Sequence, residues 1–446
     1  MTAGIRLALG ASALALATSV TARTQSEDPA IESAVAADYE AHLDELFVWF
    51  HENPELSFLE TNTAARMAEE FRAAGLEVTV GVGGTGVVGM LRNGEGPLIM
   101  LRADMDALPL EERSGLPYAS TVRQVREDGT EVPVMHACGH DAHMTSLVGT
   151  ARQLSAMRDR WRGTIMFVAQ PAEEIISGAP AMLEDGLYER FGKPDYALAY
   201  HAAAGVPVGT LSAAEGIQAS SSDFMTIVVP GIGTHGAQPH LGRDPIYITS
   251  QIVVALQSID SREVMPLAPV VVSVGSFHAG SNHNIIPDSA QLQLTVRAND
   301  EAVRAQALQA IERIVVNVAR AHGMPEDRLP QITYGGGTPV TFNDPALARR
   351  LNTAMRDAFG EDAVVPFQQT HMAGEDFAYF TTAEQGVPGY YFGVGATLPE
   401  DIEAAANGGP PVAGHHSPLF RIDPQGTVTM GTRAMIAAVL ELAPAE

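Results

Sequence analysis

The chain has 446 residues, which allows roughly two to four domains of ordinary size and a large buried core. Hydrophobic residues make up 46% of it and charged residues 18%, a composition that excludes a mostly disordered or fibrous protein. With 27 basic and 53 acidic side chains, the formal net charge is −26. Such a chain repels phosphate groups, which argues against nucleic acid and anionic membrane surfaces as partners.

The N-terminal segment has the pattern of a secretory signal peptide. Arg6 supplies a positive charge, residues 7–20 form an uncharged apolar run, and residues 21–22 offer small side chains for cleavage. The run is too short to span a bilayer comfortably. We therefore predict a cleaved signal peptide over residues 1–22 and an exported protein, periplasmic or secreted. Cys138 is the only cysteine, so an intramolecular disulfide is impossible.

After this segment, short apolar strands alternate with amphipathic helices, a pattern that predicts an α/β fold. Ligand groups in such folds lie at the C-terminal ends of the strands, so polar residues that directly follow a strand are candidates for chemistry. The predicted helices include residues 31–50, 61–74 and 145–157, and the predicted strands include 98–101, 164–168 and 196–200.

From about residue 220 the order of elements becomes strand, helix, strand, strand, helix, strand, the split pattern of a ferredoxin-like α+β domain. The alternation of helices and strands seen in the first part of the chain resumes after residue 338. We predict a discontinuous catalytic domain over residues 30–215 and 337–446, interrupted by an inserted domain over 216–336. The inserted strands are expected at 223–229, 270–277, 292–298 and 329–334, and the inserted helices at 245–259 and 302–321.

Metal-competent side chains are concentrated in residues 136–143, whose sequence is HACGHDAH. Cys138 and His140 are two residues apart, which suits a loop or extended segment that converges on one ion. Thiolate and imidazole are ligands suited to zinc-like ions. The alternative is a polar loop with a buried thiol, but this density of metal-competent groups favours a metal site.

Carboxylates and histidines also follow apolar segments elsewhere in the α/β portion. In a pair of adjacent glutamates, one carboxylate can bind a metal while the other handles protons. Each of these signals alone also fits an ordinary structural role, such as a turn cap, a solvated surface or a satisfied core histidine. The residues concerned are Asp104, Asp106, Glu173, Glu174, His201 and His416.

Together these positions resemble the peptidase M20 amidohydrolases, in particular the branch of aminoacylase-like, hippurate-hydrolase-like and auxin-conjugate hydrolases. The resemblance covers nearly the whole chain after about residue 38. It is carried by seven ordered motifs, RADMDALPLE (102–111), HACGHDAH (136–143), QPAEE (170–174), GTHGAQPH (233–240), NIIPD (284–288), GEDFAYF (374–380) and HSP (416–418).

The resemblance implies a metallo-aminopeptidase-like catalytic domain with an inserted ferredoxin-like lid that often dimerises. It also implies two divalent metal ions per chain (Zn, Mn, Co or Ni), with Cys138 as the candidate bridge between them. Because His415 directly precedes His416, the choice of ligand between them rests on the His-Ser-Pro pattern. The implied metal ligands are Cys138, His140, Glu174, His201 and His416.

The remaining roles implied by the resemblance concern catalysis and substrate binding. Glu173 is expected to be the general base, and Asp106 to orient a metal-binding group. His235 in the lid is expected to stabilise the tetrahedral oxyanion, in several members across the dimer. Asn284 and Arg297 are expected to hold the substrate carboxylate, a task for which arginine is well suited.

We therefore predict a metal-dependent amidohydrolase that cleaves the amide bond of N-acyl amino acids or related small amides by metal-activated water. A homodimer or higher homo-oligomer is expected through the lid. Two alternatives stay open: a carboxypeptidase or dipeptidase of the same fold, and a catalytically silent binding protein. A silent protein should have lost a ligand or the base, whereas all the ligand positions and Glu173 are intact.

Overall fold

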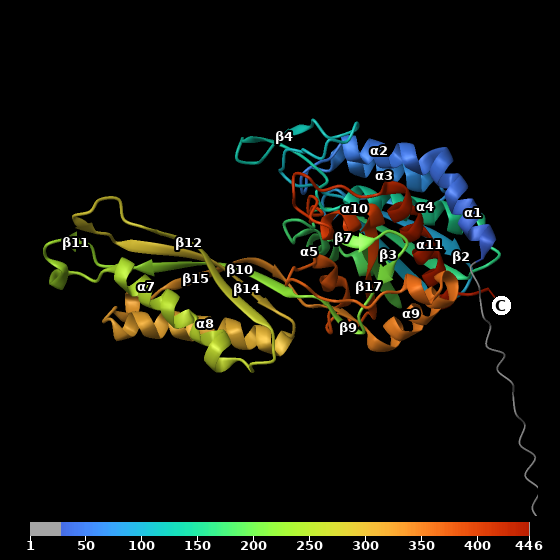
Figure 1. Cartoon of the computed structure of the whole chain (residues 1–446). Helices are drawn as coiled ribbons and strands as arrows, with labels where there is room; N and C mark the ends of the chain where they lie inside the picture. The colour runs from blue at the N-terminus through green and yellow to red at the C-terminus, as the bar shows by residue number, and fades with distance from the viewer. Residues whose placement is uncertain (1–27, 446) are drawn as a thin grey trace, which may run out of the picture.

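The computed structural model describes residues 28–445, so the predicted signal peptide lies outside the described residues. Figure 1 shows two domains, a larger one around a seven-stranded sheet and a smaller one around a four-stranded sheet. This α/β domain with an α+β insertion confirms the predicted fold class. Among residues 28–445, no helix combines the length and the apolar character that crossing a membrane requires.

The seven-stranded sheet has a parallel centre and antiparallel edges. Its central strands are buried along nearly their whole length, as expected for strands covered by helices on both faces. In spatial order the strands are β1 (Glu77–Val82), β2 (Gly86–Asn93), β6 (Gly163–Gln170), β3 (Leu98–Asp104), β7 (Tyr196–Pro207), β17 (Gly389–Thr397) and β8 (Leu211–Ser212).

Helices cover both faces of this sheet and enclose two apolar cores. Successive residues of β3 alternate between them: Ile99 and Leu101 join one core, and Met100 joins the other. This alternation explains why the strand is apolar throughout. The first face is covered by α1 (Pro29–Asp38), α2 (Asp44–Glu52), α3 (Thr61–Ala73), α4 (His140–Ala156), α9 (Pro345–Phe359) and α11 (Pro424–Leu442), and the second by α5 (Gly178–Glu184), α6 (Leu187–Phe191) and η6 (Asp376–Thr381).

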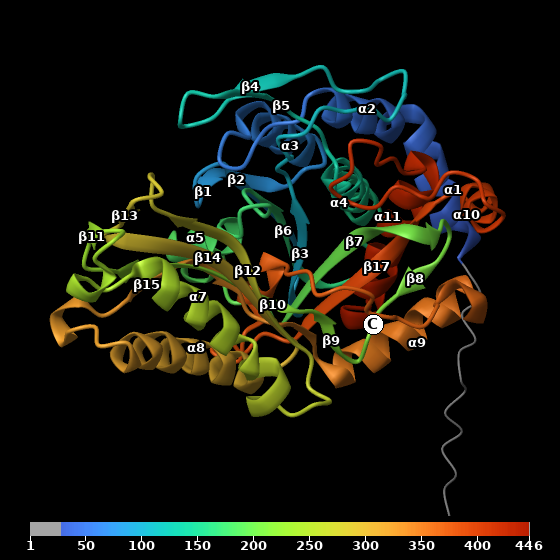
Figure 2. The same cartoon turned by 60° about the vertical axis from the view of Figure 1, so that its left-hand side comes forward.

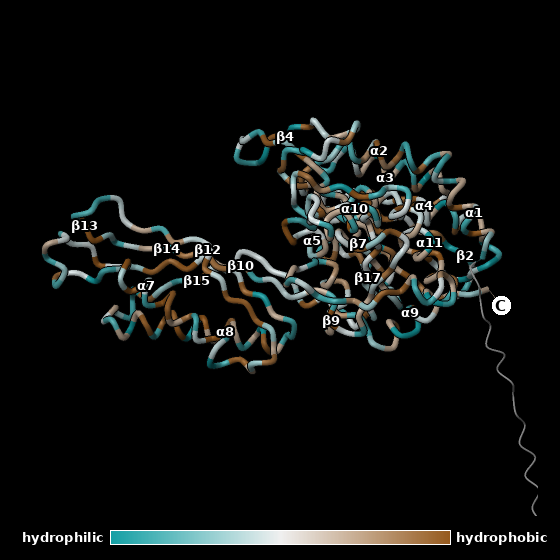
Figure 3. Tube along the Cα trace, viewed as in Figure 1, coloured by the Kyte–Doolittle hydropathy of each residue, from teal (hydrophilic) through white to brown (hydrophobic). Residues whose placement is uncertain are grey.

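The smaller domain has the predicted β-α-β-β-α-β order, and its antiparallel strands follow the order β12-β14-β10-β15 (Figure 2). Both of its helices contribute to an apolar core of its own, and Figure 3 shows apolar stretches within each domain. The elements are β10 (Ser221–Pro230), α7 (Pro245–Leu256), β12 (Val270–Ala279), β14 (Ser289–Ala298), α8 (Glu301–Ala321) and β15 (Gln331–Thr338). We call this domain the lid.

Two crossings of the chain join the lid to the larger domain. β9 (Gly216–Ala219) leads into the lid and β16 (Thr341–Asn343) leads out of it, and the two pair as antiparallel strands. The loop before η6 packs closely on this junction, because a Cβ placed on Gly374 would lie 2.9 Å from atoms of both Ser222 and Thr338. Glycine therefore allows this loop, which ends in residues of the candidate site, to touch the base of the lid.

The structure differs from the sequence prediction at the start of α4. This helix begins at His140 rather than near residue 145, so His140 and His143 lie on its first turn and not on a loop. Gly139 turns the chain with a φ of 87°, a conformation that favours glycine. The first turn of this helix could not be predicted from periodicity, because its buried side chains are polar residues of the candidate site and do not form an apolar pattern. The predicted helix 31–50 is also interrupted, by a π-helical turn over residues 39–43.

Candidate active site

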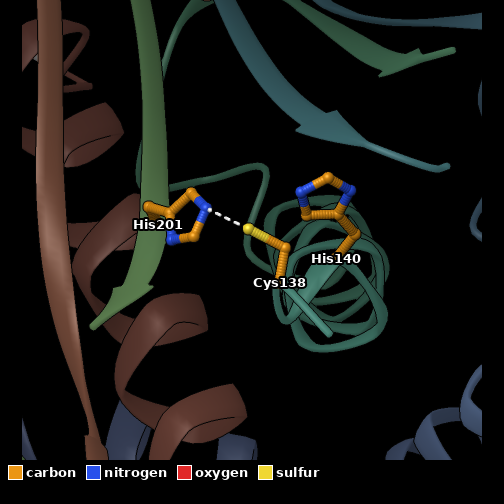
Figure 4. Close-up of side chains that lie close together, drawn as sticks. All are labelled: Cys138, His140 and His201. Atoms are coloured by element: carbon orange, nitrogen blue, oxygen red, sulfur yellow. Dashed lines mark hydrogen bonds between the residues drawn. The ribbon is translucent and has the colours of Figure 1, made fainter. Parts of the chain in front are cut away.

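The predicted thiol and two of the predicted imidazoles meet at the C-terminal side of the central sheet. Figure 4 shows Cys138 between His201, which lies on β7, and His140, which begins α4. Sγ of Cys138 lies 3.3 Å from Nε2 of His201. One potential ligand atom from each of the three residues lies within 4.8 Å of the others. This is the spacing expected of side chains that converge on a cation.

Glu174 and His416 complete a second group that shares Cys138. Nε2 of His416 lies 3.3 Å from Oε2 of Glu174, and the two side chains form a cluster with the thiol. His415 points elsewhere, because its Nε2 lies 2.8 Å from the carbonyl oxygen of Ala202. A φ of 61° at His416 turns the chain between the two histidines, and such strain in a non-glycine residue is typical of functional sites.

The donor atoms left free in this cluster fit a metal ion. Nδ1 of His140 lies 2.8 Å from the carbonyl oxygen of Asp106 and donates to it, which leaves Nε2 as the lone-pair donor. Within residues 28–445, that buried Nε2 and the buried Oε1 of Glu174 have no hydrogen-bond partner, and they lie 4.0 Å apart. Leaving such atoms unsatisfied costs about 1–3 kcal/mol each, so coordination of a divalent cation explains their arrangement.

Glu173 lies beside this cluster and in a different environment from Glu174. Its carboxylate is within 4.8 Å of ligand atoms of His140 and Glu174, and also of the carboxylates of Glu375 and Asp376. Burial, followed by repulsion from Glu375, raises the pKa of Glu173 well above its usual range. Burial also raises the pKa of Glu174, to about 8. A carboxylate that gains protons readily is suited to proton transfer.

Asp106 positions both glutamates through their backbone. Its two carboxylate oxygens accept hydrogen bonds from the amide of Glu173 at 3.0 Å and of Glu174 at 2.9 Å. Its carbonyl oxygen also accepts the bond from His140 described above. Asp106 therefore acts through other residues, as expected of an orienting group, and is a positioning residue of the site.

A buried network of hydrogen bonds lies beside the cluster, and the sequence did not predict that its residues would meet. Arg102 contacts carboxylate oxygens of Asp104 at 2.6 Å and of Glu375 at 2.9 Å. Asp104 accepts in turn from His143 at 2.6 Å, and Nε2 of His143 accepts from the amide of Ala202 beside His201. These residues lie within the motifs RADMD, HACGHDAH and GEDFAYF, but only the tertiary structure joins the motifs into one network.

The predicted lid residues fall at opposite ends of the lid. His235 lies on β11 (Thr234–His235), which pairs with β13 (Ile285–Ile286), and Asn284 lies next to it, where its carbonyl accepts from the amide of Gly236 at 2.7 Å. Both are exposed at the end of the lid remote from the larger domain (Figure 1). Arg297 is eight residues beyond Ser289, the first residue of β14, so about 27 Å of strand separates Arg297 from the end of the lid that carries Asn284.

Arg297 lies at the end of the lid next to the larger domain. Its Nη1 donates to the carbonyl oxygen of Met372 at 3.3 Å, three residues before Glu375. Within one chain, therefore, the structure places Arg297 towards the cluster and places His235 and Asn284 away from it. One carboxylate cannot contact Asn284 and Arg297 of the same chain in this arrangement.

A thiol, imidazoles and a carboxylate around one buried centre, with a second carboxylate free for proton transfer, define a metal-dependent hydrolase. Residues 100–407 match the family model described as peptidase family M20/M25/M40. The chain belongs to this family and is a metal-dependent amidohydrolase, which confirms the predicted family and enzyme class.

Several relatives are similar along most of their length. A hippurate hydrolase of Campylobacter jejuni is 40% identical, over 77% of this chain and 86% of the relative. Thermostable carboxypeptidase 2 of Saccharolobus solfataricus is 38% identical, over 77% of this chain and 83% of the relative. The crystal structure of YXEP of Bacillus subtilis, a dinuclear metal-binding peptidase of the M20 family, superposes with a TM-score of 0.71 at 29% identity, covering 93% of this chain and 100% of that one.

Proposed function

We propose that this enzyme hydrolyses N-acyl amino acids with a free carboxylate, to a carboxylic acid and an amino acid. The observation that carries the proposal is the position of Glu173, buried beside a cluster of ligand atoms that fits a divalent cation. The hippurate hydrolase, whose name states an N-acyl amino acid substrate, supports the choice of substrate.

The metal complement proposed is two divalent ions per chain, drawn from Zn, Mn, Co and Ni. Cys138 belongs both to the group with His140 and His201 and to the group with Glu174 and His416, which supports a bridging thiolate. When bound, such ions supply Lewis acidity, which polarises the scissile carbonyl and makes water a stronger acid. Burial raises the pKa of the Cys138 thiol well above its usual range in the protein alone, so the cations would also keep that sulfur deprotonated.

The proton path is proposed to run through Glu173. Its carboxylate accepts a proton from the attacking water as the new C–O bond forms, and returns it to the leaving nitrogen as the C–N bond breaks. Asp106 keeps Glu173 in place through the amide hydrogen bond. Arg297 holds the substrate carboxylate in this scheme, because its hydrogen-bond acceptors in residues 28–445 are neutral, Oγ1 of Thr295 and the carbonyl of Met372.

His235 and Asn284 are proposed to serve the site of a second copy in a homodimer formed through the lid. Their distance from the cluster of their own chain supports this arrangement. Nδ1 of His235 accepts from the amide of Ala237 at 3.0 Å, which leaves Nε2 as the N–H donor that an oxyanion needs. β12 is an edge strand of the lid sheet, with apolar residues over 270–272, and is a suitable surface for pairing between copies.

The decisive experiment is a hydrolysis screen of the protein reconstituted separately with Zn, Mn, Co and Ni. N-acetyl and N-benzoyl amino acids are compared with dipeptides at equal concentrations. Faster turnover of the N-acyl amino acids is expected. Faster turnover of dipeptides would instead favour a carboxypeptidase or dipeptidase, the alternative that the Saccharolobus relative supports. Light scattering at graded protein concentrations tests the dimer, and a monomer throughout would refute it.

Export is proposed from the signal-peptide pattern of residues 1–22, which lie outside the described part of the chain. The test is expression of the full chain in a Gram-negative host, followed by cell fractionation and N-terminal sequencing of the purified protein. A mature N-terminus close to residue 23 in the periplasm is expected. An intact Met1 in the cytoplasm would contradict the proposal.

A further inference from the structure

An exposed aromatic ring lies beside Arg297 on the open face of the lid sheet. Phe224 on β10 is 38% exposed, and its ring centroid lies 5.6 Å from the guanidinium carbon of Arg297. The two residues are diagonal neighbours, since Phe224 pairs with Thr295 and Arg297 pairs with Ser222 in the antiparallel register. Their side chains therefore share one face of the sheet.

The structure leaves room next to the ring. On the other neighbouring strand, β15, the residue opposite Phe224 is Gly336, and a Cβ placed there would meet no atom within 4 Å. The core of the lid lies on the opposite face, where Met225 and Ile227 are buried. An exposed ring with open space beside it has apolar surface available for a ligand.

The guanidinium beside the ring lacks an anionic hydrogen-bond acceptor within residues 28–445. Arg297 is half-buried and donates to the neutral oxygens of Thr295 and Met372. A half-buried cation with spare N–H donors favours a carboxylate, which it can bind through two parallel hydrogen bonds. Bonds of about 2.8 Å place the carboxyl carbon about 4 Å from the guanidinium carbon. In an amino acid the Cα is one bond further, so its side chain comes within reach of Phe224.

From this juxtaposition we infer that Phe224 forms the subsite for the side chain of the leaving amino acid, and that the enzyme prefers N-acyl derivatives of apolar and aromatic amino acids. The inference rests on the proposed function, in which Arg297 holds the substrate carboxylate. Glycine has no side chain to place on the ring and gains nothing from it. The preference therefore arises from the apolar surface that a larger side chain buries.

The test compares kcat/KM for N-acetylphenylalanine, N-acetylleucine and N-acetylglycine in the full-length metal-loaded enzyme. The wild type is expected to favour the first two over N-acetylglycine by about tenfold or more, a typical gain for an apolar subsite. Phe224→Ala should lower kcat/KM about tenfold for these two substrates and leave that for N-acetylglycine within about twofold. Phe224→Thr retains a residue suited to a strand and serves as a second variant if Phe224→Ala does not fold.

Val228 supplies the matched control. It lies on the same strand and face, is 37% exposed, and is about 13 Å further from the larger domain. Val228→Ala should leave all three substrates unaffected. Equal losses for all three substrates in Phe224→Ala, or a wild type without side-chain preference, would overturn this inference but leave the proposed function standing. Failure of the wild type to hydrolyse any of them would overturn the proposed function, and the inference with it.

Discussion

His201 presents Nε2 to Sγ of Cys138 at 3.3 Å while its Nδ1 lies 2.7 Å from the carbonyl oxygen of Ala202. The hydrogen bond to Ala202 assigns the proton to Nδ1, and Nε2 is left with the lone pair that a metal ligand needs. The contact joins the segment just before α4 to β7, across 63 positions of the chain.

Cys138→Ala should lower metal content and activity together, because it removes the ligand shared by both clusters. Metal per chain is measured by elemental analysis, and activity by amide hydrolysis. Full occupancy and full turnover in this variant would refute the thiolate assignment. Alkylation offers a second check, since Cys138 is the only cysteine and bound metal should protect it.

Glu173→Gln and Glu174→Gln should have different effects although the residues are adjacent. Glu173→Gln keeps the size of the side chain but removes its basicity, so kcat should fall by about 10²–10⁴ with metal content unchanged. Glu174→Gln removes a ligand carboxylate and should lower metal content. Elemental analysis of both variants checks the assignment, and metal loss in Glu173→Gln alone would mean that the two roles are exchanged.

His235→Ala should lower kcat by about 10²–10³, the usual effect of removing an oxyanion donor, with metal content unchanged. Because His235 lies remote from the cluster of its own chain, a mixture of His235→Ala and Glu173→Gln protomers should regain activity after subunit exchange. Each mixed dimer has one complete site, and half of the dimers are mixed, so about a quarter of wild-type activity is expected. A mixture that stays inactive although exchange is complete would show that His235 acts within its own chain.

Arg297→Ala should raise KM more than it lowers kcat, because binding of the substrate carboxylate is equal in the ground state and the transition state. The effect should shrink for substrates whose carboxylate is amidated, since these lack the anion. Steady-state kinetics on matched acid and amide pairs measure the difference. Equal impairment of both would identify Arg297 as a structural residue at the base of the lid.

His51 predicts a pH dependence of stability, because both of its ring nitrogens contact carboxylates. Its Nδ1 lies 2.7 Å from Asp141 and its Nε2 3.1 Å from Glu112. Burial lowers the pKa of His51, but the two carboxylates outweigh it and raise the pKa from 6.5 to about 10. The native state therefore retains a proton that the unfolded chain releases.

The stabilisation from His51 is full below about pH 6.5 and is lost as the pH rises towards about 10. The free energy of unfolding in urea, measured at pH 7, 8 and 9, should fall less steeply in His51→Gln than in the wild type. The absolute stability of the variant should be lower at pH 7, because Asp141 and Glu112 lose a buried cation. Parallel pH slopes in the two proteins would contradict this assignment.

The sequence by itself determined the fold class, the order of the main elements in the lid and the chemical types in the site. Periodicity reveals strands and helices because burial of one face is a local property of the chain. The motif around Cys138 was visible because thiol, imidazole and carboxylate groups rarely gather at such density in a short segment. The seven ordered motifs then identified the family that the match over residues 100–407 confirms.

Only the tertiary structure decided how these groups meet. The neighbours His415 and His416 face different partners because of the positive φ at His416, which no sequence period encodes. Asn284 lies before the start of β14 and Arg297 lies near its end, so the extended strand separates two residues that are only 13 positions apart in the sequence. The carboxylates of Asp104 and Glu375 meet on Arg102 across 271 positions of chain, since charge pairing in a buried site depends on packing between distant elements and not on local pattern.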